Sequence, residues 1–393
     1  MPLLDESLID DEDAIARADS RQTLRSLASA GAQVRRGIHL SAEAGVDRVG
    51  GGQRPRSVLV ASLGGSAVVA DVLELLAEPG SPVPVSGRRN LPLPGWVGPL
   101  DLVIAVSQSG RAEGPLALAA EAARRGAALL TVGAPGSPLA EICARARGIH
   151  VDIPVERTSS RTSLWSLLTP VVLAANALGL VVADELALAR VADRLDAQAE
   201  SFRPGSETFV NPAKALAAEL ADGVPVLLGD GPLTGVAACR AACMVARTAR
   251  IPATWGELPD AASQIVACFG GPFTDGGASA SAGPRGAADI FADPFLDGPP
   301  SPRLRLLMLR DVTPEAGTAQ AIVARQLADA LVQTAQHAGV RVSEHVTDPG
   351  HPLERLAGHI ALTDFAATYL ALGLGMDPAL SPHVADLRDR TSR

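Results

Sequence analysis

Hydroxyl side chains and a glycine follow an apolar run of the sequence in the pattern of an anion-binding turn. Ser107, Ser109 and Gly110 come directly after the β-branched run 102–106, and an alanine- and leucine-rich helical pattern begins after them. A glycine can take the positive φ that a tight turn needs. The free backbone N–H groups and the positive dipole end of a helix attract an anion. An ordinary strand-to-helix turn capped by serine would show the same pattern, so this stretch alone leaves both interpretations open.

A second turn, with Gly65 and Ser66, follows the apolar run 56–61. Strand and helix patterns alternate from there to residue 153, which predicts a doubly wound parallel α/β sheet with right-handed crossovers. Ligands of such sheets bind at the carboxyl ends of the strands, near the point where the strand order reverses. Both glycine–serine turns fall at carboxyl ends, so together they favour a ligand site over two ordinary turns.

The elements that would position these turns follow from hydrophobic periodicity. Strands are predicted at residues 56–61, 83–85, 102–106, 128–132 and 149–153. Residues 161–199 have a helical pattern and are expected to connect two lobes. The strand–helix pattern then restarts, with strands at 224–229, 304–309 and 340–346. We therefore expect N-terminal helices in 1–50, a first lobe in 51–160, a helical connection in 161–200 and a second lobe in 201–393, with a Gly/Pro-rich surface insertion at 270–302.

The composition excludes several classes of protein. The 393 residues are 47% hydrophobic but only 3% aromatic, so alanine, leucine and valine must form the cores, as suits helices packed on parallel sheets. A net charge of −9 disfavours nucleic acid or an anionic membrane as a partner. No apolar run is long and clean enough to span a membrane. The acidic N-terminus lacks the basic and apolar regions of a signal peptide, so a cytoplasmic protein is expected.

Cysteines and histidines show no metal-site pattern. The four cysteines form no CxxC pair, and we expect Cys239 and Cys243, four residues apart on a predicted helix, to be buried in packing. His351 and His359 are eight residues apart, and no two histidines between 337 and 359 share a tight helical spacing, which favours structural or surface roles. No metal, nucleotide or other cofactor is expected.

The two turns resemble the phosphate-binding turns of the sugar isomerase (SIS) fold. Over nearly its whole length the chain further resembles the bifunctional phosphoglucose/phosphomannose isomerase family. This resemblance rests on the order and spacing of several short segments, namely Ser107 to Leu116, Ser160-Arg161-Thr162-Ser163-Leu164, Asn211-Pro212-Ala213-Lys214 and Pro352-Leu353-Glu354-Arg355-Leu356. It implies two SIS-type lobes, each a doubly wound, three-layer unit with a parallel sheet flanked by helices, and a homodimer.

The same resemblance implies a ligand and its binding residues. Members of the family interconvert aldose and ketose hexose 6-phosphates, so a phosphorylated hexose or a related sugar phosphate is the expected ligand. The residues that would hold it are those of the two turns and an arginine near the reacting end of the sugar: Gly65, Ser66, Ser107, Ser109, Gly110 and Arg161. Ala112 stands where the family has a threonine, which removes one hydroxyl.

The family's catalytic positions are substituted in this chain. The family uses a glutamate for proton transfer, a histidine for ring opening and a lysine near the C-terminus. Aligning Pro252-Ala253 and Glu257-Leu258-Pro259-Asp260 on the family's Pro-Ala and Glu-Leu-Pro-Glu places Arg247 at the glutamate position and Ser263 at the histidine position. The lysine position near the C-terminus is Arg388, in Asp386-Leu387-Arg388. Arginine stays protonated and cannot act as a general base, and serine without an activating partner is a poor acid or base.

Two interpretations of function therefore stay open. The first is a phosphosugar-binding protein in which standard isomerase chemistry is doubtful. The alternative is an active glucose-6-phosphate/mannose-6-phosphate isomerase with a relocated base, for which Glu257 is the candidate. A loop-capping role for Glu257 competes with that assignment.

Overall fold

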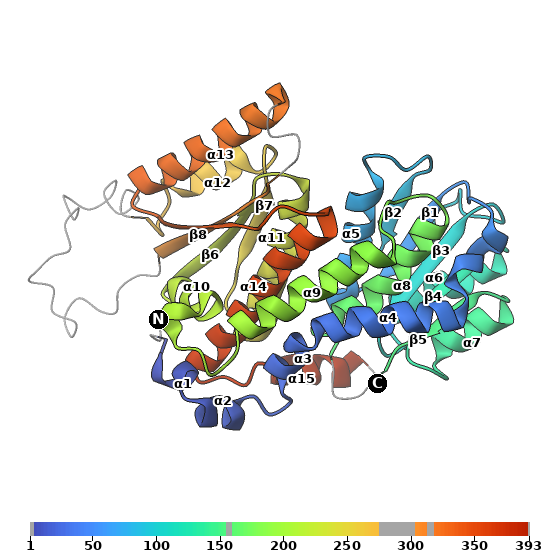
Figure 1. Cartoon of the computed structure of the whole chain (residues 1–393), viewed down its shortest axis with the longest axis horizontal. Helices are drawn as coiled ribbons and strands as arrows, with labels where there is room; N and C mark the ends of the chain where they lie inside the picture. The colour runs from blue at the N-terminus through green and yellow to red at the C-terminus, as the bar shows by residue number, and fades with distance from the viewer. Residues whose placement is uncertain (1–3, 155–158, 275–302, 313–317, 392–393) are drawn as a thin grey trace, which may run out of the picture. The chain divides into compact units, whose positions relative to one another are not determined.

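The chain folds into two compact units, each built on a parallel sheet (Figure 1). A computed structural model describes residues 4–154, 159–274, 303–312 and 318–391. One unit, called the five-stranded unit here, comprises Arg25–Ala199 and His351–Glu354. The other, the four-stranded unit, comprises Met1–Leu24, Glu200–Gly350 and Arg355–Arg393. The predicted insertion at 270–302 lies almost entirely outside the described residues.

The sheet of the five-stranded unit confirms the predicted parallel sheet. Its strand order is β2-β1-β3-β4-β5, and every neighbouring pair is parallel. The strands are β1 (Val58–Ser62), β2 (Val85–Arg88), β3 (Leu102–Ser107), β4 (Ala128–Gly133) and β5 (Ile149–Asp152). β1 and β3 are buried at every position, because helices cover both faces of the sheet. β2 starts two residues later than predicted, after Pro84, which has no N–H to give to a ladder.

Helices with small apolar side chains form the two outer layers of this unit. One face of the sheet carries α6 (Glu113–Arg124) and α7 (Pro138–Arg145), whose buried residues form one core with β1, β3 and β4. The other face carries α4 (Ala30–Ala44), α5 (Val68–Ala77) and α8 (Leu164–Ala177). The remaining elements are α3 (Thr23–Ala28), η1 (Val46–Gly52), η2 (Gly64–Ser66) and α9 (Glu185–Ser201).

The helical pattern of residues 161–199 corresponds to two helices with a break between them, which the sequence analysis did not predict. α8 ends at Ala177 and α9 begins at Glu185. Gly179 takes a left-handed φ of +67°, and the N–H of Leu180 donates to the carbonyl of Ala175 at 2.9 Å. This pairing is the helix-ending arrangement that a glycine after the last turn permits.

The four-stranded unit repeats the plan with a second parallel sheet, in the order β7-β6-β8-β9. Its strands are β6 (Gly223–Gly229), β7 (Thr254–Glu257), β8 (Arg303–Arg310) and β9 (Arg341–Val346). The sequence did not predict β7, which is short and has its first two residues exposed. One face packs against α12 (Ala262–Cys268) and α13 (Ala319–His337). The unit's other helices are α1 (Ser7–Asp10), α2 (Glu12–Ala18), η3 (Thr208–Val210), α10 (Pro212–Leu220), α11 (Pro232–Met244), η4 (Val245–Ala249), α14 (Pro352–Gly373) and α15 (Pro382–Thr391).

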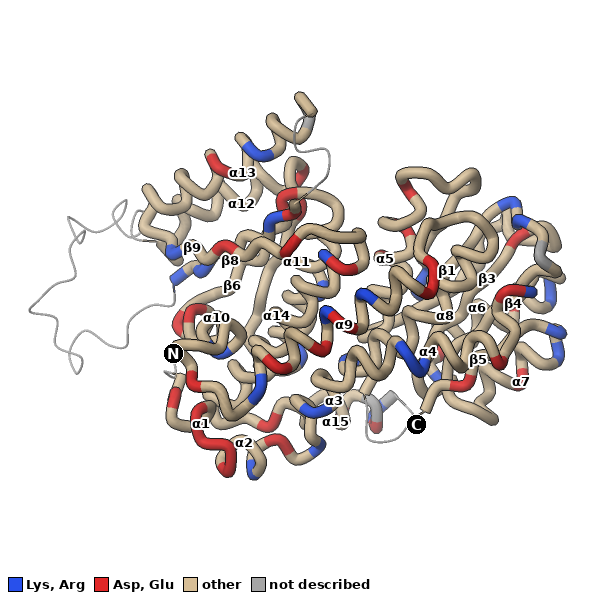
Figure 2. Tube along the Cα trace, viewed as in Figure 1, with Lys and Arg blue, Asp and Glu red and all other residues tan. Residues whose placement is uncertain are grey.

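The only lysine of the chain, Lys214, joins the N-terminal helices to this unit. Its side chain is fully buried, and Nζ donates to the carbonyl oxygens of Pro204 (2.7 Å) and Ser206 (2.6 Å) and to Asp10 (3.1 Å). Figure 2 shows acidic residues gathered along α1 and α2. Asp10 is the member of that acidic stretch that Lys214 neutralises.

Two further findings concern the predicted burial of two cysteines and the search for membrane-spanning helices. Cys243 is exposed and Cys239 is partly exposed, so the prediction that both are buried is wrong. Both lie on α11, whose buried positions are held by other residues, four of them alanines. Among the helices that the structure describes, none combines the length and the hydropathy needed to cross a membrane.

Candidate functional site

The strand order of the five-stranded unit reverses between β1 and β3. From β1 the chain runs to β2 on one side, and it then crosses to β3 on the other side of β1. At such a point the turns after the two central strands separate and leave a crevice at their carboxyl ends. The predicted turns occupy this position: η2 (Gly64–Ser66) follows β1, and residues 107–110 end β3.

The turn after β3 is held by its own hydroxyl groups. Ser107 is buried, and its Oγ accepts from the N–H of Ala112 (3.3 Å). Ser109 is exposed, and its Oγ accepts from the N–H of Arg111 (3.3 Å). Gly110 has a φ of +62°, and a Cβ on it would overlap with the Ser137 hydroxyl. The turn therefore requires a glycine for two independent reasons.

We expect Gly110→Ala to destabilise the five-stranded unit and to distort the turn. The left-handed backbone alone costs about 1–2 kcal/mol for a residue with a Cβ, and the overlap with Ser137 adds to it. Gly50→Ala is the matched control, because Gly50 has the same φ of +62° but open space around its Cβ position. Urea unfolding should separate the two variants, and equal losses of stability would contradict a steric role for Ser137.

The turn after β1 lies against the segment that carries Arg161. A Cβ on Gly65 would come within 2.7 Å of the Ser160 Oγ and 3.3 Å of the Arg161 backbone nitrogen. Only a residue without a side chain lets the two segments approach so closely. The hydroxyl of Ser66 is buried and donates to the carbonyl of Leu63 (2.9 Å).

Three helices begin around this crevice, and their N-cap residues leave the first turns uncapped. In the described part of the chain, Ala67, Ala112 and Ser163 make no side-chain hydrogen bond to α5, α6 and α8 respectively. By contrast, Ser137 caps α7 and Asn211 caps α10. Uncapped first-turn N–H groups and positive dipole ends stabilise an anion. The carboxyl edge between β1 and β3 therefore presents groups that suit a phosphate or another anion.

The corresponding point of the four-stranded unit is filled by the chain's own carboxylates. Asp230 follows β6, and its Oδ1 accepts from the Thr234 hydroxyl (2.9 Å) and from the N–H of Asp311 (3.0 Å). Burial raises the pKa of Asp230 above its ordinary value. Asp311 in turn pairs with Arg355 at 2.8 Å. Among the residues that the structure describes, this edge of the four-stranded unit presents buried carboxylates, which suit an anion less well than the turns of the five-stranded unit do.

The three substituted family catalytic positions and Glu257, the candidate relocated base, lie on four different elements of the four-stranded unit. Glu257 ends β7 against the first turn of α11, where a Cβ on Gly235 would overlap with its carboxylate. Arg247 is half-buried on η4, a π-helical turn. Ser263 is exposed on α12, and Arg388 lies on α15. The position of Glu257 suits a carboxylate that complements a helix dipole.

The π-helical turn changes the backbone next to Arg247. Arg250, directly after η4, takes a left-handed φ of +59°, which is uncommon for a residue other than glycine. Its Nη2 donates to the carbonyl oxygens of Asp377 (2.9 Å) and Leu380 (2.6 Å). π-turns are frequent at functional sites, and no residue pattern in the sequence predicted this one.

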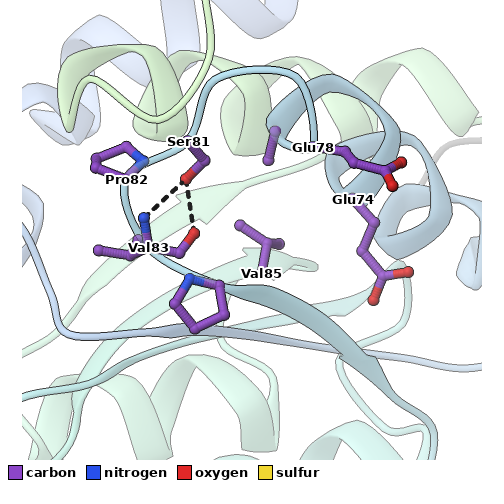
Figure 3. A pocket seen from close by; sticks show the side chains of 8 residues that line it. Glu74, Glu78, Ser81, Pro82, Val83 and Val85 are labelled. Atoms are coloured by element: carbon purple, nitrogen blue, oxygen red, sulfur yellow. Dashed lines mark hydrogen bonds between the residues drawn. The ribbon is translucent and has the colours of Figure 1, made fainter.

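A separate cavity of about 620 Å³ lies beside the start of β2 (Figure 3). Glu74, Glu78, Val83 and Val85 line it, and the Ser81 hydroxyl braces its loop by donating to the carbonyl of Val83 (2.7 Å). Because this loop precedes β2, the cavity lies at the amino end of the strand. It is therefore distinct from the crevice at the carboxyl ends.

Comparison with known proteins agrees with this architecture. Residues 209–391 match the family described as the bacterial phospho-glucose isomerase C-terminal SIS domain. A bifunctional phosphoglucose/phosphomannose isomerase of Caldicellulosiruptor bescii is 26% identical over 196 residues. That alignment covers 50% of this chain and 57% of the relative, so it spans little more than half of the curated protein.

Solved structures show the same fold over most of the chain. A hypothetical protein from Thermus thermophilus has a TM-score of 0.66 at 14% identity, covering 96% of this chain and 92% of its own. A tagatose-6-phosphate ketose/aldose isomerase from Escherichia coli has a TM-score of 0.62 at 15% identity, covering 91% and 93%. These two likenesses establish the fold alone. Taken with the family match, they confirm the predicted resemblance: residues 209–391 match a SIS-domain family, and the chain is similar to the bifunctional phosphoglucose/phosphomannose isomerases.

Proposed function

We propose that the chain binds a sugar phosphate in the crevice between β1 and β3, in keeping with the phosphosugar isomerase family that it resembles. The observation that carries the proposal is the set of uncapped helix starts at two glycine–serine turns. Backbone N–H groups and the hydroxyls of Ser107 and Ser109 would bind the phosphate. Arg161, on the neighbouring segment, would contact the sugar.

The missing threonine hydroxyl at Ala112 weakens this site without removing it. One lost hydrogen bond costs about 0.5–1.5 kcal/mol, whereas the N–H groups of the turns do not depend on that side chain. The ligand-binding residues proposed are therefore those of the two turns and Arg161.

We further propose that binding occurs without the standard isomerase chemistry. Arg247, Ser263 and Arg388 replace groups that must take up and return protons, and arginine cannot do so near neutral pH. The alternative, an isomerase that uses Glu257 as its base, has one favourable observation: Glu257 is half-buried at a carboxyl end of the second sheet. A homodimer in the cytoplasm is part of the proposal, supported by the family resemblance and testable by light scattering of the purified protein.

Thermal unfolding with glucose, fructose and mannose 6-phosphates, beside a coupled isomerase assay, tests the proposal. A ligand that binds the folded state raises the melting temperature as its concentration passes its dissociation constant. We expect such a shift without turnover, and we expect Ser107→Ala combined with Ser109→Ala to reduce it. Ser81→Ala, at the amino end of β2, is the control. Turnover that disappears in Glu257→Gln would support the alternative, and no shift with any hexose 6-phosphate would contradict binding.

A further inference from the structure

Gln108 connects the phosphate turn to the start of α8. It lies between Ser107 and Ser109 and is partly buried. Its Nε2 donates to the Oγ of Ser163 at 3.0 Å, although the two residues are 55 positions apart in the sequence. Ser163 is the N-cap residue of α8 and is only 2% exposed. This amide therefore links the turn after β3 to the N-cap of α8.

The segment 159–163, which carries Arg161, is held from three directions. Gly65 packs against its backbone at Ser160 and Arg161. From α4, the Nε2 of Gln33 donates to the carbonyl of Thr162 at 2.8 Å. Gln108 supplies a third contact, which comes from the turn after β3. The position of the segment relative to that turn therefore depends on Gln108.

We propose that Gln108 is a positioning residue, which holds the segment carrying Arg161 in register with the phosphate turns so that one ligand is contacted at both its phosphate and its sugar. This inference rests on the proposed function. Groups that fix the spacing of two binding elements raise affinity for a ligand that spans them, because less freedom is lost on binding. Such a residue raises the affinity for a sugar phosphate, which spans both elements, and not the affinity for inorganic phosphate, which does not.

A double-mutant cycle tests this role. Gln108→Met keeps the length of the side chain and removes its donor, and Arg161→Ala removes the group that is positioned. Calorimetry with glucose 6-phosphate and, separately, with inorganic phosphate gives the dissociation constants. We expect Gln108→Met to weaken glucose 6-phosphate binding about five- to twentyfold and phosphate binding less than about twofold. In the Arg161→Ala background, Gln108→Met should add little. If the two substitutions weakened glucose 6-phosphate binding independently, so that their fold-changes multiplied in the double variant, the proposal would be overturned.

Hydrogen exchange of the ligand-free protein tests the same role without relying on any ligand. We expect the amides of residues 159–163 to exchange faster in Gln108→Met than in the parent, because the segment has lost its contact with the turn. Gln53→Met, an exposed position in the same unit, is the matched control. Unchanged exchange in Gln108→Met would overturn the positioning role even if no hexose 6-phosphate binds. If the parent protein binds no hexose 6-phosphate but exchange is faster in Gln108→Met, the result would contradict the proposed function and not the positioning role.

Discussion

Replacing Arg240 by methionine is expected to lower the free energy of unfolding of the four-stranded unit by about 3–5 kcal/mol. Arg240 on α11 and Asp364 on α14 are 4% and 5% exposed. The Arg240 Nε donates to Asp364 Oδ1 (3.1 Å), and Nη2 donates to Oδ2 (2.6 Å). Removing the guanidinium leaves a carboxylate buried without its counter-charge, and this desolvated charge is the source of the loss.

Urea unfolding followed by the fluorescence of Trp255 measures this effect. Replacing Trp96 and Trp165 by phenylalanine leaves Trp255, in the four-stranded unit, as the only reporter. The control is Arg390→Met, whose pair with Asp386 is 75% and 55% exposed and should contribute less than about 1 kcal/mol. Arg240→Met combined with Asp364→Leu should recover most of the lost stability, because no buried charge remains. A loss in Arg240→Met no larger than in the control would contradict the assignment.

Acidification is expected to destabilise the four-stranded unit through His359. This side chain on α14 is fully buried, and its ring lies 5.1 Å from that of His345 on β9, measured between centroids. Burial, followed by the proximity of His345 and Arg355, lowers the pKa of His359 from 6.5 to about 3. Burial also lowers the pKa of His345, which Asp348 partly offsets.

The sign of the effect follows from proton linkage. Between pH 6.5 and about 3 the unfolded chain holds the His359 proton and the folded chain does not. Stability is therefore fully present above pH 6.5 and is lost as the pH falls toward 3, by about 1.4 kcal/mol per pH unit for this one group. Between pH 6.5 and 4.5 the loss amounts to about 2–3 kcal/mol, and His345 adds to it in the same direction.

The unfolding free energy at several pH values between 7.5 and 4.5 provides the measurement. We expect His359→Phe, which keeps a ring of similar size and does not titrate, to reduce the slope by about one proton. The control is His337→Gln, at the exposed C-terminal end of α13, which should leave the slope unchanged. A slope that is the same in His359→Phe and in the parent would show that His359 is not the group responsible.

The sequence by itself determined the local parts of this protein. Four of the five strands of the first sheet were predicted closely, and continuous apolar runs such as 102–106 are characteristic of strands buried on both faces. The prediction for the fifth, β2, overlaps the observed strand only at Val85. The two glycine–serine turns were predictable as well, since the positive φ of Gly110 is a property of that residue and its neighbours. The helix break at Gly179 and the short strand β7 were missed, because a single glycine and four residues give too weak a periodic signal.

Only the tertiary structure decided which of these parts meet. Gln108 and Ser163 are 55 residues apart and Arg240 and Asp364 are 124 apart, so no spacing in the chain predicts their contacts. The two sheets reverse their strand order in the same way. One reversal nevertheless leaves helix starts uncapped, and the other is filled by Asp230 and Asp311. The crossover connections decide which side chains reach the carboxyl edge of each sheet, and this is why the two edges differ. A contact between distant segments depends on the path of the chain and not on local residue preference.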